Sequence, residues 1–323
     1  MSSLSHTVPN FFIAGASKTG TTSLYHWLAA HPQVYMSPNK EPSYFSTETR
    51  PENFAPEYQA MVRQQMEDVK RFVNEGPEPK LPRKEISGVV VEWQDYLRLF
   101  SGATNETAIG EGSVCYLWSR TAAQGIAERV PHARILLILR DPAERAFSQY
   151  LHYVSLGHIS RSFRQHVMAS MNPGDKFNPF NPFLQIGLYA EHLQRYFAVF
   201  PRKQIRVWLY EDTLAQPEVF HRQVMEFLQI DTSFVPDVSK RYLEVEVPKL
   251  LGITQAMRRN GLWGRLRGLT PKPLRPMLRK AAYRRRRTVH LAQEDRRFLV
   301  DYYKDDIRRL QQLLDRDLSA WLM

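Results

Sequence analysis

A short loop near the start of the chain carries residue types that can bind an anion. Residues 11–28 read FFIAGASKTGTTSLYHWL, in which an apolar run enters a loop with two glycines and leaves it into a helix-like stretch. Loop N–H groups and the positive end of the following helix would both face such an anion. Thr21 and Thr22 can cap the helix and donate their hydroxyls to anionic oxygens. The pattern predicts an anion-binding loop, and an ordinary strand-to-helix turn with threonine caps is the alternative.

The position of the lysine separates this loop from those of proteins that bind nucleoside triphosphates. The Walker A pattern places Lys and then Ser or Thr directly after the second glycine, where they contact phosphates and Mg²⁺. Here Thr21 and Thr22 occupy those positions, and the only lysine of the loop, Lys18, lies between the glycines. A lysine inside the loop suits a ligand with fewer anionic groups in a row and without a bound metal. A 5′-phosphosulfate is such a ligand.

A second apolar run leads to residues that suit a second phosphate. Arg140 directly follows RILLIL at 134–139, and Ser148 lies about two turns into the next helix-like stretch. An arginine at the carboxyl end of a strand points into the crevice where open α/β sheets bind ligands, and its guanidinium matches a phosphate. Alternatively, Arg140 pairs with Asp141 or Glu144 on the surface. The sequence leaves both interpretations open.

The order of the elements predicts a single α/β domain, a P-loop-like parallel sheet flanked by helices. Three short apolar runs have the pattern of buried parallel strands, at 11–14, 134–139 and 205–210. Each precedes a stretch of helical character, as expected of βα units. We expect a nucleotide-binding core over 11–230, followed over 231–323 by a lid or basic segment and a C-terminal helix. Further helices are expected at 58–73, 184–200 and 293–314.

Composition limits the class of protein. The chain has 323 residues, 43% of them hydrophobic and 24% charged, which is typical of a folded domain. The single cysteine, Cys115, excludes an internal disulfide and a cysteine-cluster metal site, and it suits a reducing compartment. We recognise neither a signal peptide nor an apolar stretch of membrane-spanning length. We therefore expect a cytoplasmic protein.

The net charge of +11 favours an anionic ligand, an anionic surface or both. Residues 258–287 are intensely basic, with Leu, Trp and Met between the Lys and Arg residues. This segment has three interpretations: a peripheral contact with an anionic membrane, a lid that donates basic groups to the cofactor, or a solvated basic face. No nucleic-acid-binding module is visible, so nucleic acid is not an expected partner.

Several stretches, in order along the chain, resemble the PAPS-dependent sulfotransferases, where PAPS is 3′-phosphoadenosine 5′-phosphosulfate. SKTGTTSLYHWL and RILLILRDPAERAFSQY are similar to the family's 5′-phosphosulfate and 3′-phosphate motifs. NKEPSYFS at 39–46 and GLYAEHLQRY at 187–196 resemble segments of heparan sulfate sulfotransferases and of their bacterial relatives. FLVDYYKDDIRRLQQLL resembles the family's last helix. The resemblance implies a bacterial-type enzyme of this family.

The resemblance also implies how the donor is bound. The cofactor would be PAPS, the product would be adenosine 3′,5′-bisphosphate, and no metal would be required. Arg140 and Ser148 match the positions that bind the 3′-phosphate, and Tyr242 is a candidate for stacking on the adenine. The 5′-phosphosulfate would be held by Lys18, Thr19, Gly20, Thr21, Thr22 and Ser23.

The implied chemistry is in-line transfer of the sulfuryl group to an acceptor hydroxyl, less readily to an amine. Lys18 would stabilise the leaving phosphate oxygen, and a base must take the proton of the acceptor. Glu41 matches the carboxylate that has this role in heparan sulfate O-sulfotransferases. A histidine is the alternative base, and His192, which lies inside the GLYAEH match, is a better candidate than His152 or His158.

The expected acceptor is a small molecule, a sugar or a glycolipid. The segment EGSVCY at 111–116 lacks the lysine and proline of the comparable heparan sulfate O-sulfotransferase segment, which argues against a sulfated polysaccharide. Two other functions stay open. An ATP- and Mg²⁺-dependent P-loop kinase would require a lysine after Gly20, whereas a non-enzymatic protein that binds anions or membranes would tolerate the loss of Lys18 and Glu41.

Overall fold

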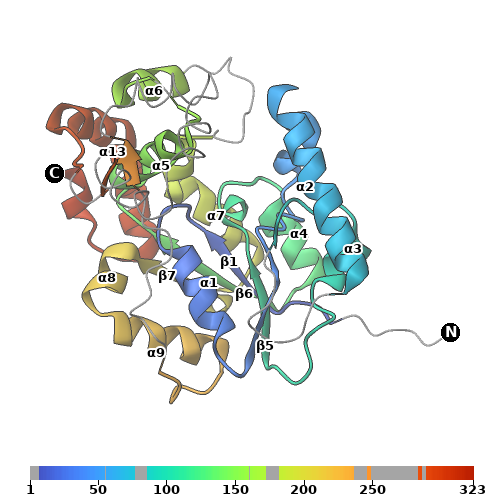
Figure 1. Cartoon of the computed structure of the whole chain (residues 1–323). Helices are drawn as coiled ribbons and strands as arrows, with labels where there is room; N and C mark the ends of the chain where they lie inside the picture. The colour runs from blue at the N-terminus through green and yellow to red at the C-terminus, as the bar shows by residue number, and fades with distance from the viewer. Residues whose placement is uncertain are drawn as a thin grey trace, which may run out of the picture.

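A parallel sheet of five strands, all within the part of the chain that the structure describes, forms the centre of the molecule (Figure 1). The computed structural model describes residues 7–54, 56–76, 86–159, 161–171, 182–235, 246–248, 283–285 and 289–323. Tyr242 and most of the basic segment 258–287 lie outside these residues. In spatial order the strands are β2 (Val34–Met36), β5 (Ala108–Gly112), β1 (Phe11–Gly15), β6 (Arg134–Leu139) and β7 (Ile205–Leu209).

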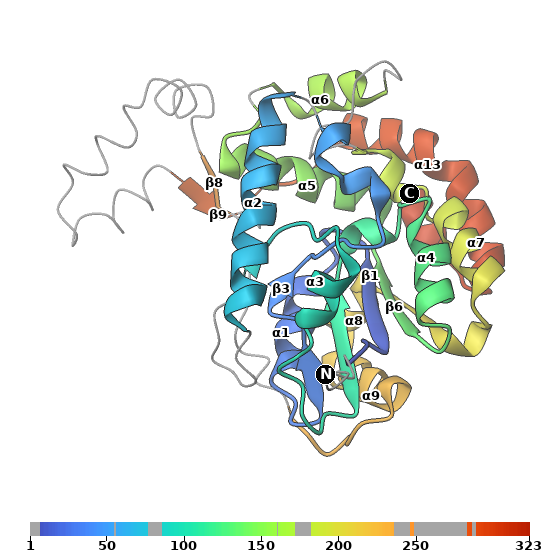
Figure 2. The ribbon, with the colours of Figure 1, turned by 90° about the vertical axis from the view of Figure 1, so that its right-hand side faces the viewer.

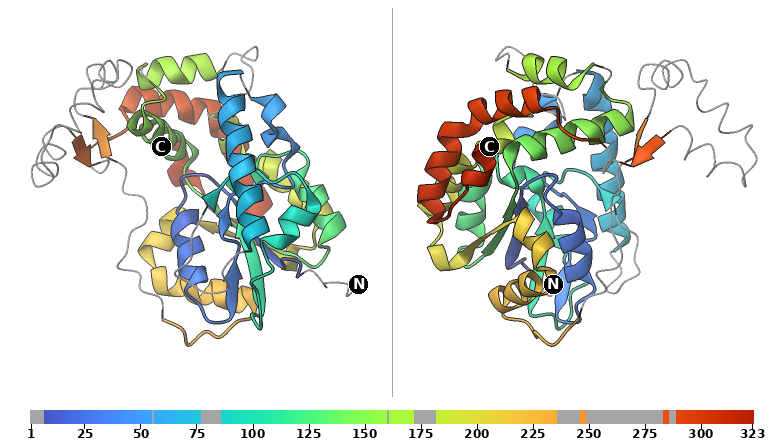
Figure 3. Two further views of the ribbon diagram at one scale, coloured as in Figure 1. Left: turned by 45° about the vertical axis from the view of Figure 1, so that its right-hand side comes forward. Right: turned by 90° about the vertical axis from the view of Figure 1, so that its left-hand side faces the viewer.

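Helices cover both faces of the sheet, and the alternation of side chains along β1 explains why (Figure 3). Phe11 and Ile13 belong to one core, and Phe12 and Ala14 belong to the other, because successive strand residues point to opposite faces. The smaller core includes side chains of α1 (Thr21–Ala29) and α9 (Pro217–Leu228). The larger core includes side chains of α3 (Trp93–Arg98), α4 (Ala122–Arg129), α5 (Pro142–Leu156), α7 (Tyr189–Val199) and α13 (Gln293–Leu314).

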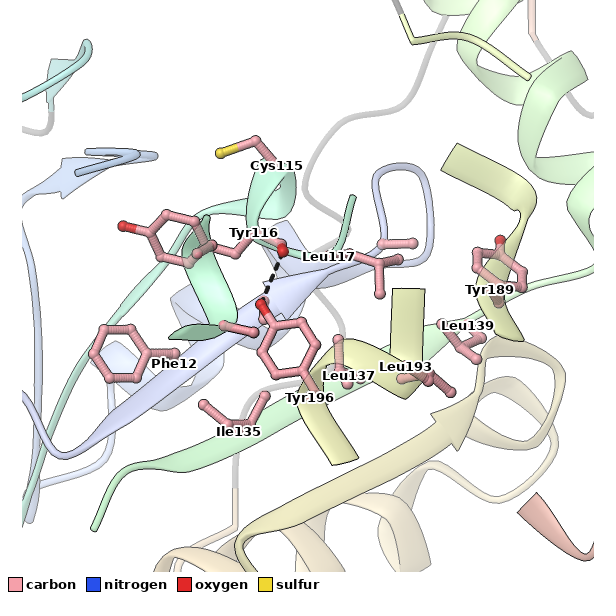
Figure 4. Close-up of a cluster of buried hydrophobic side chains, with 14 of the residues drawn as sticks. Phe12, Cys115, Tyr116, Leu117, Ile135, Leu137, Leu139, Tyr189, Leu193 and Tyr196 are labelled. Atoms are coloured by element: carbon pink, nitrogen blue, oxygen red, sulfur yellow. Dashed lines mark hydrogen bonds between the residues drawn. The ribbon is translucent and has the colours of Figure 1, made fainter. Parts of the chain in front are cut away.

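Two buried tyrosines of α7 form hydrogen bonds to the segments that follow strands β5 and β6. The Tyr196 hydroxyl donates to the carbonyl oxygen of Tyr116 at 2.8 Å (Figure 4). The Tyr189 hydroxyl donates to the carbonyl oxygen of Arg140 at 2.9 Å. Both tyrosines are fully buried, so these bonds satisfy hydroxyls that would otherwise be costly to bury.

The remaining elements lie around this framework (Figure 2). The long helix α2 (Pro56–Glu75) precedes the short strand β4 (Ile86–Ser87), which pairs in parallel with β3 (Asn39–Lys40). Helix α6 (Phe163–Ser170) follows α5, and α8 (Tyr210–Ala215) follows β7. Strands β8 (Glu246–Pro248) and β9 (Tyr283–Arg285) form an antiparallel pair. No helix within the described ranges is both long and apolar enough to span a lipid bilayer.

The predicted fold class is confirmed, and so are its three strands. The helices expected at 58–73 and 293–314 are α2 and α13, and the one expected at 184–200 is a short 3₁₀ turn followed by α7. The sequence analysis missed β2 and β5. Strand β2 has only three residues, and β5 reads AIGEG, in which two glycines and a glutamate conceal the apolar pattern.

The parallel arrangement gathers the candidate site at one edge of the sheet. Strands β1, β5, β6 and β7 all end at this edge, because neighbouring strands run in the same direction. Gly15, Gly112, Leu139 and Leu209 are their last residues. The residues that follow these four strand ends therefore meet in the crevice where open α/β sheets bind ligands.

Replacing Gly110 with Ala should destabilise the sheet. A Cβ at this position would lie 2.5 Å from the buried ring of Phe11 on the neighbouring strand. We expect Gly110→Ala to lower the free energy of unfolding by about 1–3 kcal/mol through overpacking. Gly112→Ala, two residues along the same strand, is the control because its nearest contact would be an ordinary 3.6 Å. Equal losses in urea unfolding of the two variants would contradict this explanation.

Candidate active site

The loop between β1 and α1 forms a tight turn with two left-handed residues. Lys18 and Gly20 have φ angles of 67° and 88°. At Lys18 this conformation costs about 1 kcal/mol or more, which the surrounding turn must offset. The Thr19 hydroxyl donates to the carbonyl oxygen of Ala16 at 2.7 Å and closes the turn.

Two features of this loop fit an anionic group. Gly20 is the N-cap of α1, no side chain caps the helix, and its first turn contains no acidic residue. Among the residues that the structure describes, the buried Ser17 Oγ has no hydrogen-bond partner. Free helix N–H groups and a buried hydroxyl both need partners, which the oxygens of a phosphate or sulfate would supply. The expectation that Thr21 or Thr22 caps the helix is wrong, because both are already helical residues.

A hydrogen bond ties this loop to the segment that carries Glu41. Lys40 Nζ donates to Thr22 Oγ1 at 2.5 Å, although the two residues are 18 positions apart. Burial raises the pKa of the Glu41 carboxyl above its ordinary value of 4.5, and the charges of Lys40 and Lys18 partly oppose this rise. A carboxylate with a raised pKa is a better proton acceptor than a solvated one. The loop and the candidate base therefore belong to one electrostatic site.

Arg140 lies against the loop. Its side chain is 10% exposed, and its Nη1 donates to the carbonyl oxygen of Lys18 at 3.4 Å. Its Nη2 also pairs with Glu144 at 3.2 Å, which is one of the two pairings that the sequence offered as the alternative to phosphate binding. Ser148, the other residue expected to bind the 3′-phosphate, is buried on α5.

Tyr210 is a candidate site residue that was not predicted from the sequence. Its ring lies 4.9 Å from the Arg140 guanidinium and 3.4 Å from the place where a Cβ on Gly20 would lie. It is the first residue after β7. Like Arg140, Tyr210 directly follows a strand at the edge where open α/β sheets bind ligands, so its position in the sequence was a usable signal.

Helix α5 brings His152 into the same electrostatic environment. Burial lowers the pKa of His152 to about 4, and the nearby charges of Lys18 and Lys40 contribute to this decrease. Its imidazole is therefore neutral near pH 7. The charge of Glu41 also acts on the hydroxyl of the adjacent Tyr153.

His192 has a different set of partners. It is 4% exposed, its Nε2 lies 2.7 Å from the carbonyl oxygen of Gln185, and its Nδ1 lies 2.7 Å from Nη2 of Arg195. An arginine can only donate and a carbonyl can only accept, so Nδ1 accepts and Nε2 donates. Both ring nitrogens are thus used within the protein. These hydrogen bonds favour a structural role for His192 over the catalytic role expected from the sequence.

A second buried carboxyl, Glu111, lies at the end of β5. Tyr96 Oη donates to its Oε1 at 3.3 Å, and Ser113 Oγ donates to its Oε2 at 2.8 Å. Burial raises the pKa of Glu111 to about 7. Hydrogen bonds from Tyr116, Ser113 and Tyr96 oppose this rise, and the charge of Glu41 adds to it. From the sequence, this segment was recognised only as a departure from an acceptor motif.

A family model described as "Sulfotransferase family" matches residues 9–234. The chain belongs to the sulfotransferase family. The predicted family is therefore confirmed, together with the P-loop-like sulfotransferase fold. Within the described residues, no three His, Cys, Asp or Glu side chains are grouped so that they could hold a metal ion.

Curated relatives and a solved structure support this membership. The chain is 25% identical to human carbohydrate sulfotransferase 15 over 278 residues, which cover 69% of this chain and 44% of that protein. It is 26% identical to the human bifunctional heparan sulfate N-deacetylase/N-sulfotransferase 2 over 326 residues, covering 98% of this chain and 31% of that protein. The chain thus spans less than half the length of these relatives. A sulfotransferase structure from Alicyclobacillus acidocaldarius aligns over 98% of this chain and 100% of its own, with 28% identity and a TM-score of 0.69.

The raised pKa of Glu111 makes a prediction about stability. From its ordinary value of 4.5 up to about 7, the folded protein holds a proton on Glu111 that the unfolded chain has lost. Raising the pH through this range therefore lowers the free energy of unfolding. Glu111→Gln does not titrate, so its stability relative to wild type should increase by about 2–3 kcal/mol between pH 5 and pH 8.

Urea unfolding of wild type and Glu111→Gln at the two pH values measures this difference. Glu48→Gln is the control, because the pKa of Glu48 is lowered and its carboxylate is ionised throughout the range. A stability difference between Glu111→Gln and wild type that stays constant with pH would contradict the assignment.

Proposed function

We propose that this protein transfers the sulfuryl group of PAPS to a hydroxyl group, less readily to an amine, of a sugar-containing acceptor. The hydrogen bond from Lys40 to Thr22 carries the proposal, because it holds the candidate base, Glu41, next to the anion-binding loop. The family supports a sugar acceptor over other small molecules, because the relatives are a carbohydrate sulfotransferase and a heparan sulfate N-sulfotransferase.

The loop would hold the 5′-phosphosulfate. The uncapped N–H groups of α1 and the Ser17 hydroxyl would bind its oxygens, and Lys18 would lie beside the phosphate oxygen that leaves. The remaining members proposed for this cradle are Thr19, Gly20, Thr21, Thr22 and Ser23. The Thr19 side chain already bonds within the turn, so it would contribute its backbone N–H.

The 3′-phosphate would lie beside Arg140 and Ser148. Arg140 already contacts the loop through the carbonyl of Lys18, so one guanidinium can support the loop and bind a phosphate. The Tyr210 ring, between Gly20 and Arg140, would form a wall of the nucleotide site. Tyr242 stays the sequence-based candidate for adenine stacking.

Glu41 would take the proton from the acceptor. The acceptor oxygen attacks the sulfur, its proton passes to a Glu41 carboxylate oxygen, and the bond from sulfur to the phosphate oxygen breaks with its electron pair staying on phosphate. Lys18 and Lys40 supply positive charge where this negative charge develops, so the proposal needs no metal. Among the histidines, His152 is the alternative base because it lies near the same two lysines.

Donor binding is tested by titration calorimetry with adenosine 3′,5′-bisphosphate in EDTA. We expect Arg140→Ala to weaken binding about tenfold or more, because it removes a charged hydrogen bond to phosphate. Arg134→Ala, at the opposite end of the same strand, should bind as wild type does. Binding of ATP with Mg²⁺ but not of the bisphosphate would overturn the PAPS assignment in favour of a kinase.

Base catalysis is tested by transfer of ³⁵S from labelled PAPS to p-nitrophenyl glycosides and to desulfated heparan and chondroitin polysaccharides. We expect Glu41→Gln to reduce kcat about 100-fold or more while the bisphosphate still binds. Wild-type activity should rise with pH through a pKa above 4.5, because Glu41 must be ionised to accept a proton.

Glu128→Gln, an exposed carboxylate on α4, is the control for the Glu41 variant. Unchanged turnover in Glu41→Gln, together with loss in a His152 variant, would transfer the role of base to His152.

A further inference from the structure

The turn that presents Glu41 has an unusual backbone. Glu41 and Ser43 both have left-handed conformations, with φ angles of 63° and 54°. Neither is glycine, so each costs about 1 kcal/mol or more in isolation. Such a turn persists only where neighbouring groups hold it, and its conformation decides where the Glu41 carboxylate lies.

Segments far away in the sequence hold this turn through hydrogen bonds to its backbone. The N–H of Glu41 donates to the carbonyl oxygen of Gly112 at 3.1 Å, and the N–H of Val90 donates to the carbonyl oxygen of Pro42 at 2.8 Å. The N–H of Ser43 donates to the side chain of Ser113, at 3.0 Å from Oγ. The first two bonds join main-chain groups, so the third is the one that depends on the identity of a side chain.

Glu111 fixes the orientation of the Ser113 hydroxyl that holds Ser43. The Ser113 hydroxyl has a single hydrogen, which it donates to Glu111 Oε2 at 2.8 Å, and this leaves its lone pairs towards the Ser43 N–H. The chain of donors therefore runs in one direction, from the Ser43 N–H through the Ser113 hydroxyl to the Glu111 carboxyl. Each of these three residues is 5% exposed or less.

Glu111 has no cationic partner within the described residues. The groups that act on its carboxyl are hydroxyls and the like-charged Glu41. They come from the residue after β5, from α3, from the 3₁₀ turn Val114–Tyr116 and from the Glu41 turn: Ser113, Tyr96, Tyr116 and Glu41. Burying a carboxyl without a cation lowers the free energy of unfolding. A requirement for stability alone therefore does not explain the presence of Glu111.

We propose that Glu111 is a positioning residue for sulfuryl transfer, which acts through Ser113 to hold the Glu41 turn in its left-handed conformation. This inference rests on the proposed role of Glu41 as the base. It assigns to the segment 111–113 a role in orienting the base rather than in binding the acceptor.

The chain offers a matched pair of serines for the test. Ser113 and Ser119 are both fully buried, and each donates its hydroxyl to a glutamate at 2.8 Å. Ser119 bonds to Glu48, which supports the adjacent turn at 47–49 instead of the Glu41 turn. Ser113→Ala and Ser119→Ala therefore remove the same type of hydrogen bond from two neighbouring sites.

The first readout is amide hydrogen exchange of the segment 39–44 in the full chain, which requires no substrate. We expect Ser113→Ala to speed its exchange about tenfold, and Ser119→Ala to leave it unchanged. Glu111→Leu should behave as Ser113→Ala does. Glu111→Gln should stay close to wild type, because its amide oxygen can still accept the hydrogen bond from the Ser113 hydroxyl.

The second readout is kcat for ³⁵S transfer to the panel of glycosides and polysaccharides, alongside the affinity for adenosine 3′,5′-bisphosphate. Ser113→Ala and Glu111→Leu should lower kcat about tenfold or more and leave the bisphosphate affinity unchanged. Glu111→Gln should retain most of the wild-type kcat.

Equal exchange and equal kcat in Ser113→Ala and Ser119→Ala would overturn the inference. If Glu41→Gln keeps full turnover, the proposed base is wrong instead, and the exchange data still decide whether Glu111 holds the turn.

Discussion

The hydrogen bond between Lys40 and Thr22 is the contact on which the candidate site depends. It joins the first turn of α1, which faces the donor's phosphosulfate in the proposed function, to the residue before Glu41. Without it, the anion-binding loop and the carboxylate would be connected only indirectly, through the sheet and the bond from the Glu41 N–H to the carbonyl oxygen of Gly112. The charges of Lys40 and Lys18 both act on Glu41. In the proposed function, the phosphate oxygen that gains negative charge would therefore lie beside the group that accepts the proton.

The fold could be predicted from the sequence where side-chain patterns are regular. Strand β6 is six residues, nearly all buried, and its run RILLIL has few other interpretations in an α/β chain. Strand β5 could not be found in this way, because the glycine at its centre is required by the neighbouring strand: the Phe11 ring occupies the space that a side chain at Gly110 would need. That constraint comes from strand pairing, which no local pattern records.

The site was predictable to the extent that single residues follow strand ends. Lys18 and Arg140 were predicted because they follow the ends of two strands, and Glu41 was predicted from the family resemblance. The sequence could not separate His192, whose ring nitrogens are both bonded within the protein, from His152, which shares its surroundings with the lysines. The position of Glu111 in the sequence also indicates no role. In the proposed account this carboxyl acts through Ser113 on the turn at Ser43, which lies 70 residues before Ser113 in the chain.

The central claim is that the β1–α1 loop holds the donor with Glu41 beside it, and a crystal structure with adenosine 3′,5′-bisphosphate tests this claim most directly. We expect the 5′-phosphate on the N–H groups of the loop, the 3′-phosphate against Arg140 and Ser148, and the Glu41 carboxylate on the open side of the 5′-phosphate, with room for an acceptor oxygen between them. A bisphosphate bound away from the loop would contradict the account. A Glu41 separated from the 5′-phosphate by protein atoms would contradict it equally.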